Sequence, residues 1–305
     1  MEKLHEISII VVNYNGFKDT RDLLESISRH LYSLSIEVIV VDNGSKIDET
    51  IKLSEEFDNV TFIRSHLNLG FAGGNNLGIK ASKGEYIFLL NNDTLLVDDS
   101  LLFLRDTLKN DFNIGVVSPK IHYFEPANTL QYAGYTPISA ITIRNSQPGC
   151  GEYDRGQYNT PGETAYSHGA AMMFRRELID VVGLLPEEFF LYYEEIDWCE
   201  RVKNSGFSVF YQPKALVIHK ESQTTGKDSF VKYYYMTRNR LLYALRNRKG
   251  VVRILSIVYQ IAVANTRLVV VSLLKKRFDI ASAAIKGVKD FITGKYYGRD
   301  FIKSR

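Results

Sequence analysis

Short runs of apolar residues recur along the first third of the chain, and each is bounded by Asn, Asp, Gly or Ser. These runs are Ile7–Val12, Val38–Val41, Val60–Ile63, Tyr86–Leu90 and Ile114–Val117. They are apolar throughout rather than alternating, which is typical of strands buried on both faces of a sheet. Segments with helical spacing lie between them, at Thr20–Leu31, Asp48–Phe57 and Asp98–Leu108. This alternation predicts an α/β fold built on a mainly parallel, doubly wound sheet.

The middle of the chain has a different pattern. Residues 121–165 are rich in Pro, Tyr and Gly and have little helical periodicity, so we expect loops and short strands that could contact an acceptor. Regular structure should resume with a strand at Ala170–Phe174 and a helix at Ile196–Asn204, and a last strand, Ala215–Ile218, ends at His219. We therefore predict a catalytic domain over residues 1–222 and a helical C-terminal region over residues 223–305.

Charge is distributed unevenly between these two parts. The chain has a net charge of only +3, but residues 248–305 hold thirteen basic and three acidic side chains, or +10, which leaves −7 for the first 247 residues. Such a division indicates that the C-terminal region meets an anionic partner, which we expect to be a membrane surface rather than nucleic acid. The N-terminus lacks the pattern of a signal peptide, and two distant cysteines favour a reducing compartment, so we expect a cytoplasmic protein.

Polar side chains follow each buried strand, at the edge where open parallel sheets bind ligands. The candidates for this edge are Asn13, Tyr14, Asn15, Asp42, Asn68, Gly73, Asn75, Asn76, Asn92 and Asp93. Glycine lets backbone amides approach a diphosphate, and a carboxylate there can hold a base, a ribose or a cation. Each residue alone has an ordinary alternative, because Asp42 could cap a turn and Asp93 a helix. The Gly-rich segment matches neither G-x-G-x-x-G nor a P-loop, which argues against dinucleotide and Walker-type sites.

The acidic segment Glu194-Glu195-Ile196-Asp197 is the strongest catalytic candidate. Asp197 and Arg201 are spaced i, i+4 and could form a surface ion pair on a helix. Glu195 points about 100° away from that face and has no basic residue three or four positions later. It is therefore either an N-terminal helix residue favoured by the helix dipole or a reacting group.

The order and spacing of seven stretches resemble one family. They are SIIVVNYNG (8–16), VIVVDNGS (38–45), NLGFAGGNNLGI (68–79), YIFLLNNDT (86–94), GAAMMFRRELI (169–179), FFLYYEEIDWCERV (189–202) and VIHKES (217–222). Together they make the chain similar to glycosyltransferase family 2 enzymes with a GT-A fold, particularly bacterial rhamnosyltransferase-like members that build surface polysaccharides. The resemblance spans residues 7–245.

This resemblance assigns roles to the candidate residues. It implies that Asp42 contacts the nucleotide base or ribose and that Asp93 is the last acid of a D-x-D metal motif, although Asn91 replaces the first acid. It makes His219, otherwise a buried or capping histidine, the residue that completes a Mn²⁺ or Mg²⁺ site. Family members usually have Asp where Glu195 stands, so the general base is Glu195 or its neighbour Glu194.

The resemblance further implies an inverting transfer from a dTDP- or UDP-sugar, with a rhamnose-like sugar favoured, to a glycan or polyprenyl-linked saccharide. A non-catalytic sugar-nucleotide-binding or scaffold protein on the same fold is the competing hypothesis. A nucleotidyltransferase is disfavoured, because the loop at residues 13–15 is not the basic Gly-rich loop expected of one.

The stretch Ile254–Leu274 has the length of a membrane span but is interrupted by polar residues and Arg267. On a helical projection Arg253, Ser256, Gln260 and Arg267 fall on one narrow stripe, and Lys275-Lys276-Arg277 follow. We predict a helix lying in the headgroup plane at the inner face of a cell membrane. The alternative is a helix packed on the catalytic domain or on a second subunit of a homodimer.

Overall fold

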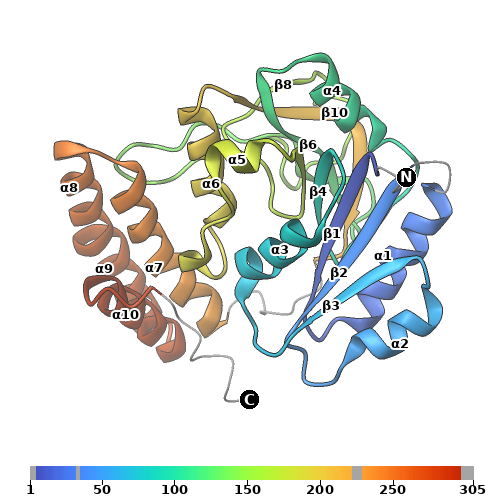
Figure 1. Ribbon diagram of the computed structural model, residues 1–305. Coiled ribbons are helices and arrows are strands. Elements are labelled where there is room, and N and C mark those ends of the chain that lie inside the picture. Colours follow the sequence, from blue (N-terminus) through green and yellow to red (C-terminus); the bar gives the residue numbers. More distant parts are fainter. Residues whose placement is uncertain (1–4, 32–34, 222–228, 297–305) are drawn as a thin grey trace.

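The computed structural model describes residues 5–31, 35–221 and 229–296, and a ten-stranded sheet forms its centre (Figure 1). The strand order is β3-β2-β1-β4-β9-β6-β10-β5, with β7 paired to β6 and β8 to β10. The strands are β1 (Ile7–Asn13), β2 (Ile36–Asn43), β3 (Val60–Ser65), β4 (Tyr86–Asn91), β5 (Thr94–Leu96), β6 (Ile114–Tyr123), β7 (Thr129–Tyr132), β8 (Gly162–Glu163), β9 (Ala171–Arg175) and β10 (Ser208–His219).

The sheet is parallel in its N-terminal half and mixed beyond it. β3, β2, β1 and β4 run parallel as the sequence predicts, and β10 is parallel to β6. β9 lies antiparallel between β4 and β6, and β5, β7 and β8 are also antiparallel to their partners. The expectation that every strand is buried on both faces is wrong for β3, which is half-exposed because it forms the edge of the sheet.

The helices of the catalytic part surround this sheet. They are α1 (Phe17–His30), α2 (Glu49–Glu56), α3 (Gly70–Ala81), α4 (Leu102–Asn110), α5 (Leu178–Val182), the 3-10 turn η1 (Glu187–Phe189) and α6 (Glu194–Asn204). The sequence pattern predicts α1, α2, α4 and α6, but the Gly-rich segment of α3 is noted there only as backbone that could approach a diphosphate. In the structure this segment is a helix whose glycines let it lie close to the sheet. A Cβ on Gly78 would stand 2.3 Å from the Ile10 side chain, and one on Gly74 would stand 2.8 Å from Val12.

Four helices and one π-helical turn form the C-terminal region. They are α7 (Phe230–Asn247), α8 (Gly250–Tyr259), η2 (Gln260–Asn265), α9 (Thr266–Leu274) and α10 (Phe278–Ile292). Figure 1 shows them grouped beside α6, away from the strands of the N-terminal half. Buried aromatic and aliphatic side chains of α7 pack with Phe189 and Tyr193, so the C-terminal region shares small cores with the segment that precedes α6.

The segment Gly250–Leu274 is, within the described residues, the one helix long and apolar enough to cross a membrane. Two residues of its polar stripe, Ser256 and Gln260, face the protein, whereas Arg253 is half-buried and Arg267 is exposed. Ser256 donates to the carbonyl oxygen of Ile141 at 3.0 Å, and the Gln260 amide donates to that of Thr142 at 2.9 Å. Both side chains are fully buried, because the loop around residue 141 offers carbonyls that need donors.

Candidate active site

Parallel pairing aligns the ends of β1, β2 and β4 and so gathers the predicted polar residues at one edge. Asn13 stands opposite Asp42 in the register, and Val12 stands opposite Asn91. Asp42 is fully buried, and its Oδ1 accepts the Ser45 backbone N–H at 3.2 Å. Its Oδ2 has no hydrogen-bond partner in the described part of the chain. The carboxylate therefore caps a turn, as one alternative from the sequence has it, and its Oδ2 lies 3.9 Å from the Arg64 Nε.

Most of the predicted amide side chains bond to the protein itself. Asn13 donates to Glu49 at 2.8 Å, Asn92 donates to Thr20 at 3.1 Å, and the Asn68 oxygen accepts the Gly70 N–H at 2.8 Å. In α3, Asn75 and Asn76 are buried. Asn75 donates to the Phe71 carbonyl at 2.9 Å, and Asn76 pairs with both backbone groups of Leu185. These amides shape the loops and fasten α3.

Three other candidates of this group differ in exposure. Tyr14 is half-buried, Asn15 is exposed, and Gly73 is buried. Asn15 has a φ of 50°, a left-handed conformation that asparagine tolerates, and its backbone N–H donates to Ser45 at 2.8 Å. The two loops that follow β1 and β2 are thus joined, with the Asn15 and Tyr14 side chains on the accessible side.

Asp93 and His219 lie together, as the resemblance implies. Antiparallel pairing of β5 with β10 places Thr94 opposite His219, and the His219 Nε2 is 3.0 Å from the Asp93 Oδ1. The other ring nitrogen, Nδ1, is 2.8 Å from the Gln131 Oε1 on β7. A side-chain oxygen at Nδ1 requires an N–H there, which leaves the Nε2 of a neutral imidazole with a lone pair facing a carboxylate.

This donor set fits a divalent cation. A lone pair and a carboxylate oxygen that face each other repel unless a proton or a metal ion lies between them. Within residues 5–31, 35–221 and 229–296 no group of three or more His, Cys, Asp or Glu side chains is placed to hold a metal. A cation held by Asp93 and His219 would accordingly need further oxygen ligands from a bound substrate or water.

The two glutamates open α6 in contrasting surroundings. Glu194 is buried, its Oε2 has no partner among the described residues, and burial together with the charge of Glu195 raises its pKa well above the usual range. Glu195 is half-buried, and burial raises its pKa to about 7. A Cβ on Gly169 would stand 3.7 Å from the Glu195 carboxyl carbon and 3.8 Å from the Phe71 ring, so the side chain runs along a glycine face.

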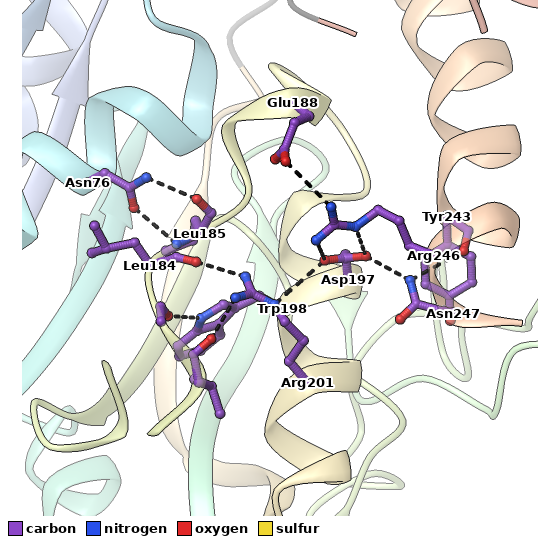
Figure 2. A network of polar contacts seen from close by, with 12 residues as sticks. Asn76, Leu184, Leu185, Glu188, Asp197, Trp198, Arg201, Tyr243, Arg246 and Asn247 are labelled. Atoms are coloured by element: carbon purple, nitrogen blue, oxygen red, sulfur yellow. Dashed lines mark hydrogen bonds and ion pairs between the residues drawn. The ribbon is translucent and has the colours of Figure 1, made fainter. Parts of the chain in front are cut away.

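Asp197 lies in a different environment, at the contact between α6 and α7 (Figure 2). It is fully buried, and Arg246 donates to both of its oxygens at 3.0 and 3.2 Å. Asn247 donates to the same carboxylate at 2.7 Å, and Arg201 lies 3.7 Å away. The expected pair with Arg201 exists, but it is not a surface pair, because α7 covers it.

An aromatic cluster that the sequence pattern did not single out connects the glutamates to the Asp93–His219 pair. The Tyr135 ring stacks on Tyr166 at 4.2 Å and lies over His168 at 6.2 Å, and His168 meets His219 edge-on at 6.2 Å. The charge of Glu195 contributes to raising the pKa of both tyrosines. Burial and the neighbouring His219 lower the pKa of His168 to about 3, so its imidazole is neutral. The signal for this cluster that the sequence offered was the abundance of tyrosine in residues 121–165.

Comparison with known proteins identifies the family. Residues 8–183 match the model of "Glycosyl transferase family 2", which is more than half of the chain. The low-salt glycan biosynthesis hexosyltransferase Agl10 of Haloferax volcanii is 29% identical over 247 residues, covering 78% of this chain and 75% of that protein. The dTDP-rhamnosyl transferase RfbF of Shigella flexneri is 26% identical over 258 residues, covering 79% and 80%.

Solved structures agree with this assignment at the level of the fold. The mannosyltransferase PcManGT from Pyrobaculum calidifontis, in complex with GDP-Man and Mn²⁺, superposes with a TM-score of 0.60 at 14% identity, over 96% of this chain and 89% of that one. The family and fold expected from the motifs are confirmed. The chain belongs to glycosyl transferase family 2, and it is a glycosyltransferase with a GT-A fold.

Proposed function

We propose that this glycosyltransferase moves a rhamnose-like sugar from a dTDP- or UDP-sugar to a hydroxyl of a glycan or polyprenyl-linked acceptor, with inversion at the anomeric carbon. The similarity to a dTDP-rhamnosyl transferase and to a glycan-building hexosyltransferase supports the substrate class. The observation that carries the chemistry is Glu195, a half-buried carboxyl group with a pKa of about 7. A general base works best when its pKa lies near the working pH.

In this mechanism Glu195 accepts the proton of the acceptor hydroxyl as its oxygen forms a bond to the anomeric carbon. The bond from that carbon to the diphosphate oxygen breaks on the opposite face, and the nucleoside diphosphate leaves. Glu194 is the more deeply buried of the two, and burial together with the charge of Glu195 raises its pKa well above the usual range. We therefore assign the base to Glu195 rather than to Glu194.

Asp93 and His219 would hold Mn²⁺ or Mg²⁺, and Gln131 would keep the His219 ring oriented. When bound, the cation neutralises charge on the diphosphate. The buried Asp42, with one oxygen not hydrogen-bonded, would contact the ribose or base of the donor. Asp197 has both oxygens engaged by α7, so we assign it to the attachment of that helix.

A screen of nucleotide sugars tests this function. Purified protein is incubated with dTDP-, UDP- and GDP-sugars and a lipid-linked saccharide acceptor, and release of nucleoside diphosphate is measured with and without chelator. Glu195→Gln should abolish transfer while donor affinity is retained, and Glu194→Gln should retain a measurable rate. Donor binding without turnover on any acceptor would favour the scaffold hypothesis, and a wild-type rate for Glu195→Gln would move the base elsewhere.

We also propose that the outer face of α8 and α9 attaches the enzyme to the inner face of an anionic membrane. Ser256 and Gln260 of this helix face the protein, and many of its apolar side chains face outward. The large exposed side chains here include Val251, Ile254, Leu255, Val258, Val270, Val271, Leu273 and Leu274. Exposed Lys275 and Lys276 follow directly.

Charge favours a lipid surface over a second copy as the partner of this face. Residues 248–305 carry +10, so two copies brought together through this region would repel, whereas anionic headgroups would attract it. Basic residues near such a surface contribute about 1 kcal/mol each. The apolar side chains would enter the boundary between headgroups and acyl chains, as interfacial helices do.

A further inference from the structure

The segment that carries the glutamates into the site has an unusual backbone. Phe190, Tyr192 and Tyr193 have φ angles of 64°, 69° and 77°, and none of them is glycine. Left-handed backbone is unfavourable in bulky residues and persists only where the surroundings impose it. Glu194 and Glu195 follow immediately, so the direction in which their side chains leave the backbone depends on this turn.

Asn239 on α7 holds the carbonyl groups of this turn. Its side-chain amide donates to the carbonyl oxygens of Phe189 at 2.9 Å, Leu191 at 2.7 Å and Tyr192 at 2.7 Å. Asn239 is fully buried. Three carbonyl dipoles that converge in a buried place repel one another, and Asn239 supplies a donor to each of them. The Phe189 oxygen also accepts the Leu191 backbone N–H at 2.7 Å.

Arg238, the preceding residue, completes the contact. One guanidinium nitrogen donates to the carbonyl oxygens of Glu188 at 2.9 Å and Phe189 at 2.7 Å, and the Nε donates to the Asn239 side-chain oxygen at 2.9 Å. That last bond fixes which way the Asn239 amide points. Arg238 is fully buried, and its positive charge opposes the rise in the pKa of Glu194.

The same turn also touches the Gly-rich helix. The Phe71 backbone N–H near the start of α3 donates to the Phe190 carbonyl oxygen at 2.7 Å. A Cβ on Gly70 would stand 2.2 Å from that oxygen, so only glycine permits the approach. Phe71 also lies against the place where Glu195 passes Gly169. The turn is thus fixed from α3 on one side and from α7 on the other.

We propose that Arg238 and Asn239 are positioning residues of the transfer reaction, which hold the left-handed turn so that the Glu195 carboxylate meets the acceptor hydroxyl. This inference rests on the proposed role of Glu195 as base. It makes α7 part of the catalytic apparatus, although it lies in the C-terminal region and outside the matched residues 8–183. Displacements of about 1 Å in a reacting group can lower a rate roughly a hundredfold.

The test compares Asn239→Ala with Asn247→Ala in the full chain. Asn247 lies on the same helix and also bonds to α6, but through Asp197 and not through the turn. Asn239→Ala should lower kcat ten- to a hundredfold with donor KM within about threefold of wild type. The acidic limb of its pH–rate profile should move to lower pH, because a Glu195 released towards water loses the cause of its raised pKa. Asn247→Ala should lower the melting temperature while leaving kcat and the acidic limb of the pH–rate profile unchanged.

Arg238→Lys provides a second variant if Asn239→Ala does not fold, and it should show a smaller loss of kcat in the same direction. A wild-type kcat and pH profile in either folded variant would overturn the positioning role, as would equal kcat losses in Asn239→Ala and Asn247→Ala. Failure of both variants to fold would assign the two residues to folding alone and would also overturn it. Glu195→Gln separates the two proposals. Full activity in that variant would overturn the role of Glu195 as base and the positioning role with it. Lost activity in Glu195→Gln together with a wild-type kcat in Asn239→Ala would overturn the positioning role alone.

Discussion

Adjacent residues of one sequence type acquire different chemistry here because the backbone sends them into different surroundings. Glu194 enters a buried place with one oxygen not hydrogen-bonded, Glu195 runs along Gly169, and Asp197 is bonded by two side chains of α7. The sequence separated Asp197 from Glu195 by helical spacing, but it did not separate Glu194 from Glu195. That distinction depends on burial, which distant elements create.

The titration of Glu195 should be visible in the transfer rate and in the free energy of unfolding. Its pKa of about 7 predicts a transfer rate that rises with pH through about 7, since the base must be deprotonated. The raised pKa means that the folded state favours the neutral form, so its contribution to stability is present at low pH and is lost as pH rises from about 4.5 through 7. The free energy of unfolding in urea should be the same for Glu195→Gln and wild type at pH 4. At pH 8 it should be greater for Glu195→Gln by about 1–3 kcal/mol. A stability difference independent of pH would contradict this.

Gln131 should control metal affinity through His219. Its side-chain oxygen lies 2.8 Å from the His219 Nδ1 and would hold the ring in the tautomer that offers Nε2 to a cation. Loss of such a partner typically weakens metal binding ten- to a hundredfold. Gln131→Leu should therefore raise the Mn²⁺ dissociation constant by that factor when measured calorimetrically in the presence of nucleoside diphosphate. Gln157→Leu, in an exposed loop, is the control and should bind Mn²⁺ as wild type does. Equal Mn²⁺ affinity in both variants would exclude a role for the contact between Gln131 and His219 in metal binding.

At the scale of elements, strands were more predictable than the segments between them. Apolar runs predicted β1, β2, β3, β4 and β6, because strands within a sheet leave a direct trace in the sequence, and the half-exposed edge strand β3 carries such a run as well. The Gly-rich segment was not among the predicted helices, and glycine disfavours helices in isolation. In the structure the sheet overrides that propensity, because α3 gains close packing that a side chain would prevent.

Gly78 on α3 should tolerate no side chain. A Cβ there would stand 2.3 Å from the Ile10 side chain, in a buried contact with β1, so overpacking should cost about 1–3 kcal/mol. Gly162 has nothing within 4 Å of the corresponding position. We expect Gly78→Ala to lower the melting temperature by several degrees and Gly162→Ala to leave it within about a degree. Equal melting temperatures would show that α3 can shift away from the sheet without loss.

The C-terminal helices illustrate what periodicity alone cannot determine. The stripe of Ser256 and Gln260 was found in the sequence, but a helical projection does not say whether a polar stripe faces water or protein. Carbonyl groups of the loop near residue 141 determine that Ser256 and Gln260 face the protein, because these carbonyls need donors. That loop lies far away in the sequence, so the projection could not include it. Likewise Arg238 and Asn239 gave no signal as site residues, because their partners are backbone atoms of the turn before α6.

At the scale of the whole molecule, function depends on how the two differently charged parts are joined. The catalytic part gathers polar side chains at the ends of its strands. α7 lies beside α6, where Arg246 and Asn247 bind Asp197 (Figures 1 and 2). α7 has two separate attachments: Arg246 and Asn247 bind Asp197 on α6, and Arg238 binds the carbonyl groups of Glu188 and Phe189 ahead of α6. Removal of the C-terminal region is thus a poor test of membrane binding, because it would also disturb the site. Point variants on the outer face are the sharper experiment.

Such variants should abolish membrane binding without affecting catalysis in solution. Ile254 and Val258 are 62% and 54% exposed on α8 and have no polar role, so Ile254→Glu and Val258→Glu should fold normally while placing a charge in the lipid interface. In flotation assays the wild type should bind vesicles of anionic phospholipid, bind neutral vesicles poorly, and lose binding as salt rises. Each variant should reduce flotation at least tenfold and keep transfer to a soluble acceptor analogue. Ile51→Glu on α2, where the side chain is 59% exposed, is the matched control and should float as wild type does. If the wild type ignores anionic vesicles and elutes as a dimer that Ile254→Glu separates, this face joins two subunits instead, and membrane attachment is wrong.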